Sequence, residues 1–92
     1  MKKFVFRVHA IRRMFERRIS DDEVKHIIKT GETIEDYSTD MPYPSALILG
    51  WIKNRPIHVV LAYNRDDNKY IVVTAYEPSS KIWEADFKRR KQ

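Results

Sequence analysis

Residues Ser45 to Tyr76, SALILGWIKNRPIHVVLAYNRDDNKYIVVTAY, contain three runs that are rich in β-branched and aromatic residues. Such runs are typical of β-strands. The short polar segments between them have the length and composition of hairpin loops. A fourth run, Glu32–Ser38, has the pattern of a half-exposed strand, and two nearby prolines place a loop after it. The sequence therefore predicts a four-stranded antiparallel sheet, with the last three strands at Ser45–Ile52, Ile57–Tyr63 and Tyr70–Tyr76.

Two amphipathic helices are predicted upstream of these strands. The first covers His9–Ile19, HAIRRMFERRI. At about 100° per residue its apolar residues fall on one side of the helix. We expect these residues to be buried: Ala10, Ile11, Met14 and Phe15. The second helix begins after Ser20, which can form a capping box with Glu23, and it ends at Gly31.

Together these elements predict an α+β fold in which the two helices pack on one face of the sheet. A short strand within Lys3–Val8 and a C-terminal helical segment that begins after Ser79 would complete the fold. We expect Thr74 and Tyr76 to face away from the helices. No linker or internal repeat divides the 92 residues, so the chain is expected to form a single domain over residues 1–92.

The composition excludes several classes of protein. Hydrophobic residues make up 42% of the chain, which argues against disorder, and the lack of cysteine excludes disulfides and thiolate metal sites. No apolar run approaches the roughly 18 residues that a membrane span needs, and the N-terminus lacks a signal-peptide core. We therefore expect a cytoplasmic protein with no membrane partner. The formal net charge of +5 favours an anionic partner, such as nucleic acid or an acidic protein.

Several basic, histidine and hydroxyl side chains could carry chemistry. Cleavage of a phosphodiester without a metal requires a base, an acid and cations for the additional negative charge. Histidine exchanges protons near neutral pH, and arginine binds two phosphate oxygens at once. The catalytic candidates are His9, His58, Arg13 and Arg17. The candidates for RNA contact are Arg12, Lys53, Arg55, Thr74, Tyr76, Arg89 and Arg90.

Each candidate also has a structural explanation. His58 lies in the apolar run PIHVVLAY, so a half-buried histidine bonded to a neighbour is an alternative to a catalytic one. His9 could help to cap the first helix, and Arg13 and Arg17 could pair with Glu16. The aromatic side chains near the C-terminus could pack in the core instead of stacking on bases. The three histidines have no spacing typical of zinc, so we expect no metal and no other cofactor.

The order of several motifs resembles that of a known family. The motifs are His9-Ala10-x-x-Arg13-Met14-x-x-Arg17, Gly31-Glu32-x-Ile34-Glu35, Arg55-Pro56-Ile57-His58 and Thr74-x-Tyr76-x-Pro78 followed by Trp83. Over residues 8–84 the chain resembles a prokaryotic family of small proteins that is classed as a domain of unknown function. That family has an H-A-x-x-R-M start and a T-x-Y-x-P end.

The resemblance implies a relation to the RelE and barnase-like nucleases, which have helices followed by a four-stranded antiparallel sheet. Many of those proteins are toxins that cut RNA. Members of this family resemble toxin partners of small zinc-binding, helix-turn-helix antitoxins. Under this resemblance His9 and His58 would be the acid and the base. The scissile phosphate and its groove would be contacted by Arg13, Arg17, Thr74 and Tyr76.

Three functions therefore stay open. The first is a metal-independent endoribonuclease that acts as the toxin of a toxin–antitoxin pair, with RNA as substrate. The second is a non-catalytic module that binds RNA or protein through the basic helix face. The third is a regulatory protein with an acidic partner, such as an antitoxin with an acidic or helix-turn-helix segment.

Overall fold

The computed structural model describes residues 3–92, which form two helices and a five-stranded sheet. In chain order the elements are β1 (Lys3–Phe6), α1 (Val8–Arg17), α2 (Asp21–Thr30), β2 (Glu32–Tyr37), β3 (Ser45–Ile52), β4 (Arg55–Asn64) and β5 (Lys69–Tyr76). The α+β class is as the sequence predicts.

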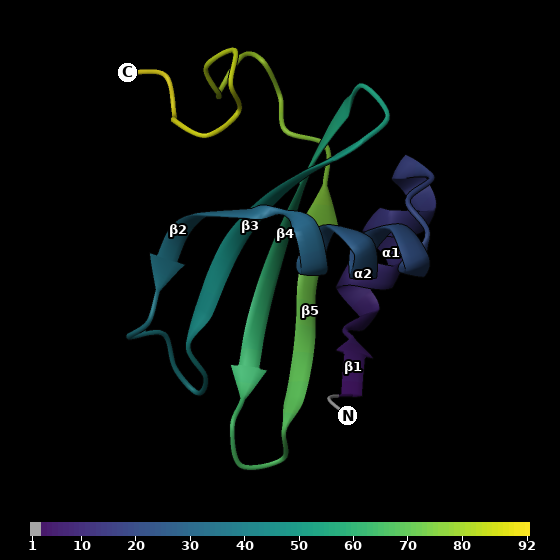
Figure 1. Ribbon diagram of the computed structural model, residues 1–92, viewed down its shortest axis with the longest axis vertical. Coiled ribbons are helices and arrows are strands. Elements are labelled where there is room, and N and C mark those ends of the chain that lie inside the picture. Colours follow the sequence, from purple (N-terminus) through teal and green to yellow (C-terminus); the bar gives the residue numbers. More distant parts are fainter. Residues whose placement is uncertain (1–2) are drawn as a thin grey trace.

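The sheet has the strand order β1-β5-β4-β3-β2 (Figure 1). Strands β2 to β5 pair antiparallel in chain order. The expected N-terminal strand is present as β1, but it pairs parallel to β5. The sheet is therefore five-stranded and mixed, and the prediction of a four-stranded antiparallel sheet is wrong. Phe4 of β1 lies against the ring of Tyr70 in β5, with 5.4 Å between ring centroids, and this contact favours pairing at that edge.

The ends of both helices follow from local chemistry. The backbone N–H of Glu23 donates to Ser20 Oγ (3.0 Å), and the backbone N–H of Ser20 donates to Glu23 Oε1 (2.9 Å), which confirms the capping box of α2. Gly31 ends α2 as predicted. A larger residue would not fit at this position, because its Cβ atom would lie 2.6 Å from the carbonyl oxygen of Leu49. Arg18 ends α1 in the left-handed conformation, with φ 56°.

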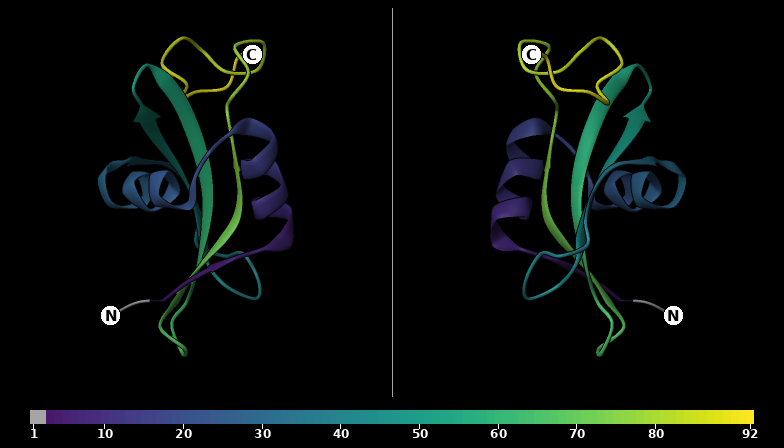
Figure 2. Two further views of the ribbon diagram at one scale, coloured as in Figure 1. Left: turned by 90° about the vertical axis from the view of Figure 1, so that its right-hand side faces the viewer. Right: turned by 90° about the vertical axis from the view of Figure 1, so that its left-hand side faces the viewer.

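The two helices lie on opposite sides of the twisted sheet (Figure 2), so the prediction that both would cover one face is wrong. The helix α2 contacts β3 and β4, whereas α1 contacts β5. The position of α1 follows from the pairing of β1 with the β5 edge, because α1 begins two residues after β1 ends. Both helices still contribute to one buried cluster: Ala10, Met14, Ile19, Val24, Ile27, Ile48, Ile57, Val59, Leu61, Val72 and Ala75.

The C-terminal segment, residues 77–92, contains no helix, which corrects the expectation of a helical segment after Ser79. Ser79 accepts backbone hydrogen bonds from the next few residues, but they form only a single turn. The chain then folds back on itself through a bridge between Trp83 and Arg90. Trp83 is 3% exposed, because this segment, at the end of the sheet where β5 stops (Figure 1), packs its ring against His58 of β4. None of the helices within residues 3–92 is long and apolar enough to cross a membrane.

Candidate functional site

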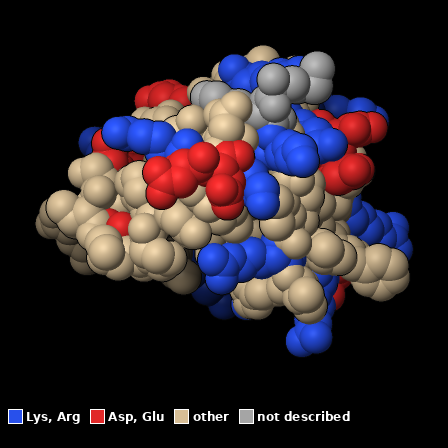
Figure 3. All heavy atoms as spheres, turned by 90° about the horizontal axis from the view of Figure 1, so that it is seen from below, with Lys and Arg blue, Asp and Glu red and all other residues tan. Residues whose placement is uncertain are grey.

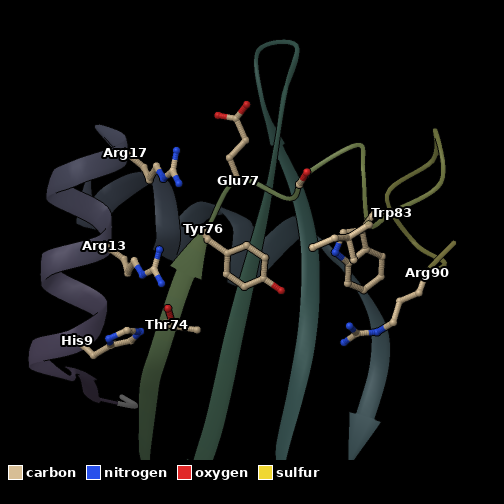
Figure 4. A pocket seen from close by; sticks show the side chains of 10 residues that line it. His9, Arg13, Arg17, Thr74, Tyr76, Glu77, Trp83 and Arg90 are labelled. Carbon is tan, nitrogen blue, oxygen red and sulfur yellow. The ribbon is translucent and has the colours of Figure 1, made fainter.

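A pocket of about 420 Å³ lies between α1, β5 and the C-terminal segment (Figure 4). We call it the α1–β5 pocket. Its lining residues are His9, Arg13, Arg17, Thr74, Tyr76, Glu77, Ser79, Ile82, Trp83 and Arg90. One wall is the cationic side of α1, the floor is the end of β5, and the opposite wall is the C-terminal segment.

The α1 wall presents His9, Arg13 and Arg17, which are four residues apart and so lie on one side of the helix. Figure 4 shows His9 and Arg13 pointing from α1 toward the Thr74 and Tyr76 side of the pocket. Within residues 3–92 the guanidinium groups of Arg13 and Arg17 form no ion pair, although Glu16 lies on the same helix. The wall therefore offers two guanidinium groups that pair with no carboxylate of the described residues, and Glu77 in the pocket lining pairs with Arg55 instead.

The floor of the pocket depends on the alternation of side chains along β5. Ala75 belongs to the buried core, so Thr74 and Tyr76 face the other side of the sheet. They face away from α2 but toward the cationic side of α1, so the expectation that they face away from the helices is wrong for α1.

Tyr76 is held by a buried histidine. His58 is 0% exposed, and its Nε2 lies 2.8 Å from the carbonyl oxygen of Phe87. A carbonyl oxygen only accepts, so Nε2 carries the proton. Burial lowers the pKa of His58, which favours the neutral imidazole with Nδ1 as an acceptor. The Tyr76 hydroxyl, 3.2 Å from Nδ1, therefore donates to His58 and leaves its oxygen lone pairs for another donor.

The imidazole of His58 is enclosed by aromatic rings. Trp83 lies edge-on to it, with ring centroids 4.5 Å apart, and Tyr76 lies at 5.3 Å in a similar arrangement. Burial also raises the pKa of the Tyr76 hydroxyl, so it stays protonated near neutral pH.

The far wall of the pocket carries Arg90, which is partly neutralised. Its guanidinium lies 4.7 Å from the centre of the Trp83 ring, and its Nε is 3.5 Å from Glu35 Oε2. The Tyr37 hydroxyl also donates to Glu35, and this hydrogen bond raises the pKa of Tyr37. Arg90 therefore adds less free positive charge to the pocket than Arg13 and Arg17 do.

The model of a known protein family, described as Domain of unknown function (DUF4258), matches residues 6–77. The chain belongs to the DUF4258 family. No curated protein and no solved structure gives a significant match. The resemblance to a family of unknown function is thus confirmed, and the relation to toxin nucleases stays a prediction.

The family match covers two of the three sides of the α1–β5 pocket. It includes all of α1 and β5, and it ends at Glu77. The wall that contains Trp83 and Arg90 lies outside the matched residues.

The chain brings together six of the predicted site residues in this pocket: His9, Arg13, Arg17, Thr74, Tyr76 and Arg90. His58 is not in the pocket lining, because it lies beside Tyr76 on the neighbouring strand β4 and is buried under Trp83 and Phe87. The contacts of His58 are therefore those of the structural alternative, a histidine within the fold that is bonded to its neighbours.

Four other candidates lie outside the pocket lining: Arg12, Lys53, Arg55 and Arg89. Arg55 donates to the carbonyl oxygens of Arg17 and Arg18 and pairs with Glu77, with 2.8 Å between Nε and Oε1. It thereby satisfies the end of α1. Arg89 pairs with Asp86, and Lys53 occupies the turn between β3 and β4 with φ 59°.

The sequence did not identify Glu77, Ser79 and Ile82 as pocket residues. A signal was available for Glu77, because it directly follows Tyr76 where β5 ends. Ser79 and Ile82 reach the pocket only because the C-terminal segment folds back, and no local pattern indicates that path.

Within the described residues, no group of three or more His, Cys, Asp or Glu side chains is arranged to hold a metal ion. On the face seen from below (Figure 3), Lys and Arg side chains are interspersed with Asp and Glu and do not form a continuous basic surface.

Proposed function

We propose that the DUF4258 domain is a metal-independent endoribonuclease that binds the RNA backbone in the α1–β5 pocket. The observation that carries this proposal is the pair of guanidinium groups without an ion pair, Arg13 and Arg17, beside His9 and the Tyr76 hydroxyl. Arginine matches the geometry of phosphate oxygens and is the residue commonly used to bind them.

The proposed reaction uses the 2′-hydroxyl of RNA as its nucleophile. The O2′–P bond forms and the P–O5′ bond breaks, which gives a 2′,3′-cyclic phosphate and a free 5′-hydroxyl. The proton of the 2′-hydroxyl must go to a base, and a proton must be given to O5′. Negative charge increases on the phosphoryl oxygens, where Arg13 and Arg17 would stabilise it.

His9 is the proposed proton-transfer group, because it is the histidine in the pocket lining and its imidazole is exposed. Tyr76 is the proposed second group. Its hydroxyl donates to His58 Nδ1, so its oxygen can accept a hydrogen bond from the 2′-hydroxyl and orient it, while His9 takes the proton of the 2′-hydroxyl and then gives it to O5′. In this scheme His58 positions Tyr76 and does not touch the substrate.

A second candidate function is non-catalytic binding of RNA in the same pocket. The observation that favours it is that only one of the two predicted histidines lines the pocket. Binding would need the arginines but not His9. The His9→Ala variant should therefore lose cleavage under the first function and keep RNA binding under the second.

Cleavage of RNA tests the first function directly. Purified protein is incubated with total RNA and with a short oligonucleotide, with and without EDTA, and the ends of the products are identified. We expect 2′,3′-cyclic phosphate ends, no effect of EDTA and no cleavage of DNA. His9→Ala and Arg13→Ala should each slow cleavage by about a hundredfold or more. Arg12→Ala is the matched control, since Arg12 is on α1 but outside the pocket lining.

Binding of an oligonucleotide that cannot react, with 2′-O-methyl groups throughout, separates the two functions. If Arg13 and Arg17 each neutralise one phosphate, removing both should reduce the slope of log K against log salt by about 1.4. Arg12→Ala should leave the slope unchanged. Salt-dependent binding without cleavage at any protein concentration would favour the second function and refute the first.

The role as a toxin rests on the resemblance of the sequence and not on the pocket geometry. Expression of the chain alone should slow growth, and His9→Ala should relieve the effect. Equal growth inhibition by both proteins would remove His9 from the mechanism.

A further inference from the structure

One side of α1 carries an apolar stripe that nothing in the described chain covers. Val8, Ile11 and Phe15 are 72%, 53% and 86% exposed, and their spacing of three and four residues puts them on one side of the helix. We call these three side chains the α1 stripe. It spans about two helical turns, roughly 10 Å.

The sequence predicts that Ile11 and Phe15 are buried, and this prediction is wrong. The core of the domain takes up Ala10 and Met14 instead, which lie on the side of α1 that faces β5. Single exposed apolar residues are common on protein surfaces. Three on successive turns of one helix form a continuous patch, and such patches mark interaction sites.

The charges around the α1 stripe indicate which occupant it fits. Arg7 and Arg18 flank the two ends of α1, and Arg12 lies beside the stripe. The helix has a single acidic residue, Glu16. A second copy of the same helix would bring these arginines together, and the repulsion disfavours self-association. An acidic partner would gain attraction from the same residues.

We propose that the α1 stripe docks an amphipathic helix of a partner protein. Apolar side chains at i, i+3 or i+4 and i+7 of that helix would pack between Val8, Ile11 and Phe15. Acidic residues beside them would face Arg7, Arg12 and Arg18. The side chains of His9 and Arg13 project into the pocket from another side of α1 (Figure 4), so this inference does not depend on the proposed nuclease function.

A designed peptide of about 18 residues tests the proposal. The peptide is helical, with Leu at the i, i+3, i+4 and i+7 positions and Glu elsewhere. Its binding is followed by NMR, and we expect amide shifts to change along α1 but not in β2 or β3. A peptide with Lys in place of Glu, and one with the same composition in scrambled order, should bind at least about tenfold more weakly.

Variants of the stripe supply the second half of the test. Phe15→Ser should weaken peptide binding by about tenfold or more without unfolding the domain, because the side chain is exposed. Met41→Ser is the matched control, since Met41 is 87% exposed and lies outside α1. Arg12→Ala should weaken binding less at high salt than at low salt.

Several results would overturn the proposal. They are equal binding by the Phe15→Ser variant, shift changes outside α1, and equal binding of the Lys peptide. Sedimentation that shows Phe15-dependent dimers, or binding to anionic phosphatidylglycerol vesicles in place of the acidic peptide, would assign the stripe to a second copy or to a lipid surface.

Discussion

Replacement of His58 by glutamine is expected to make the stability of the domain less dependent on pH below about pH 6.5. The imidazole is fully buried, and burial lowers its pKa from the ordinary value of 6.5. In the unfolded chain the same group takes up a proton at about that value. As the pH falls below 6.5, the unfolded state therefore gains a proton that the folded state takes up only at lower pH, and stability is lost.

The size of the effect follows from the burial of His58. One proton changes the free energy of unfolding by at most about 1.4 kcal/mol per pH unit. If the folded state keeps His58 neutral throughout, the loss between pH 6.5 and pH 5 reaches about 2 kcal/mol. Carboxyl groups ordinarily titrate near pH 4, so they contribute little above about pH 5.

The assay is urea denaturation at several pH values between about pH 5 and pH 7.5, with tryptophan fluorescence as the signal for unfolding. Trp83 is a suitable probe because it is buried against the imidazole of His58. The His58→Gln variant will be less stable overall, since it loses bonds to Tyr76 and Phe87, so the comparison is between slopes. His26→Gln is the control, because His26 is exposed on α2.

Two results would refute this reasoning. One is a free energy of unfolding that falls equally with acidification in the wild type and in the His58→Gln variant. The other is an NMR titration in which the His58 imidazole is protonated at its ordinary pKa. Either result would mean that the packing of Trp83 and Phe87 over His58 is not as described.

Two further predictions concern the capping of α2 and its packing on the sheet. Ser20→Ala removes the hydrogen bond to the backbone of Glu23 and should lower the free energy of unfolding by about 1 kcal/mol, whereas Ser80→Ala should change it little. Thermal denaturation measures both, and equal midpoints would contradict the role of the capping box. Gly50→Ala would place a Cβ atom 2.6 Å from Ile27 and should cost about 1–3 kcal/mol in urea denaturation. An unchanged midpoint would show that α2 can move away from β3 without loss.

The parts of the fold that the sequence predicts are those that depend on neighbouring residues. Ser20 and Glu23 are three residues apart, and the hairpin between β3 and β4 is closed by a short polar loop. The parallel pairing of β1 with β5 joins residues more than sixty positions apart, such as Lys3 and Lys69. No local pattern specifies it, and the placement of α1 depends on it.

In the candidate site, too, the features set by neighbouring residues could be predicted and those set by distant contacts could not. His9, Arg13 and Arg17 share a helix, so their spacing alone predicts that they act together. The burial of His58 depends on Phe87, which is 29 residues away and belongs to a segment without regular structure. The exposure of Phe15 also could not be predicted, because an apolar helix residue is normally assigned to the core.

The two walls of the α1–β5 pocket have different origins. The cationic wall and the floor lie within the residues that define the family, whereas Trp83 and Arg90 are supplied by the tail that follows them. A relative that shares only the family region would present Tyr76 on an open sheet surface, with no lid over its histidine. Changes confined to the tail would therefore alter the shape of the space beside the arginines while leaving the scaffold intact.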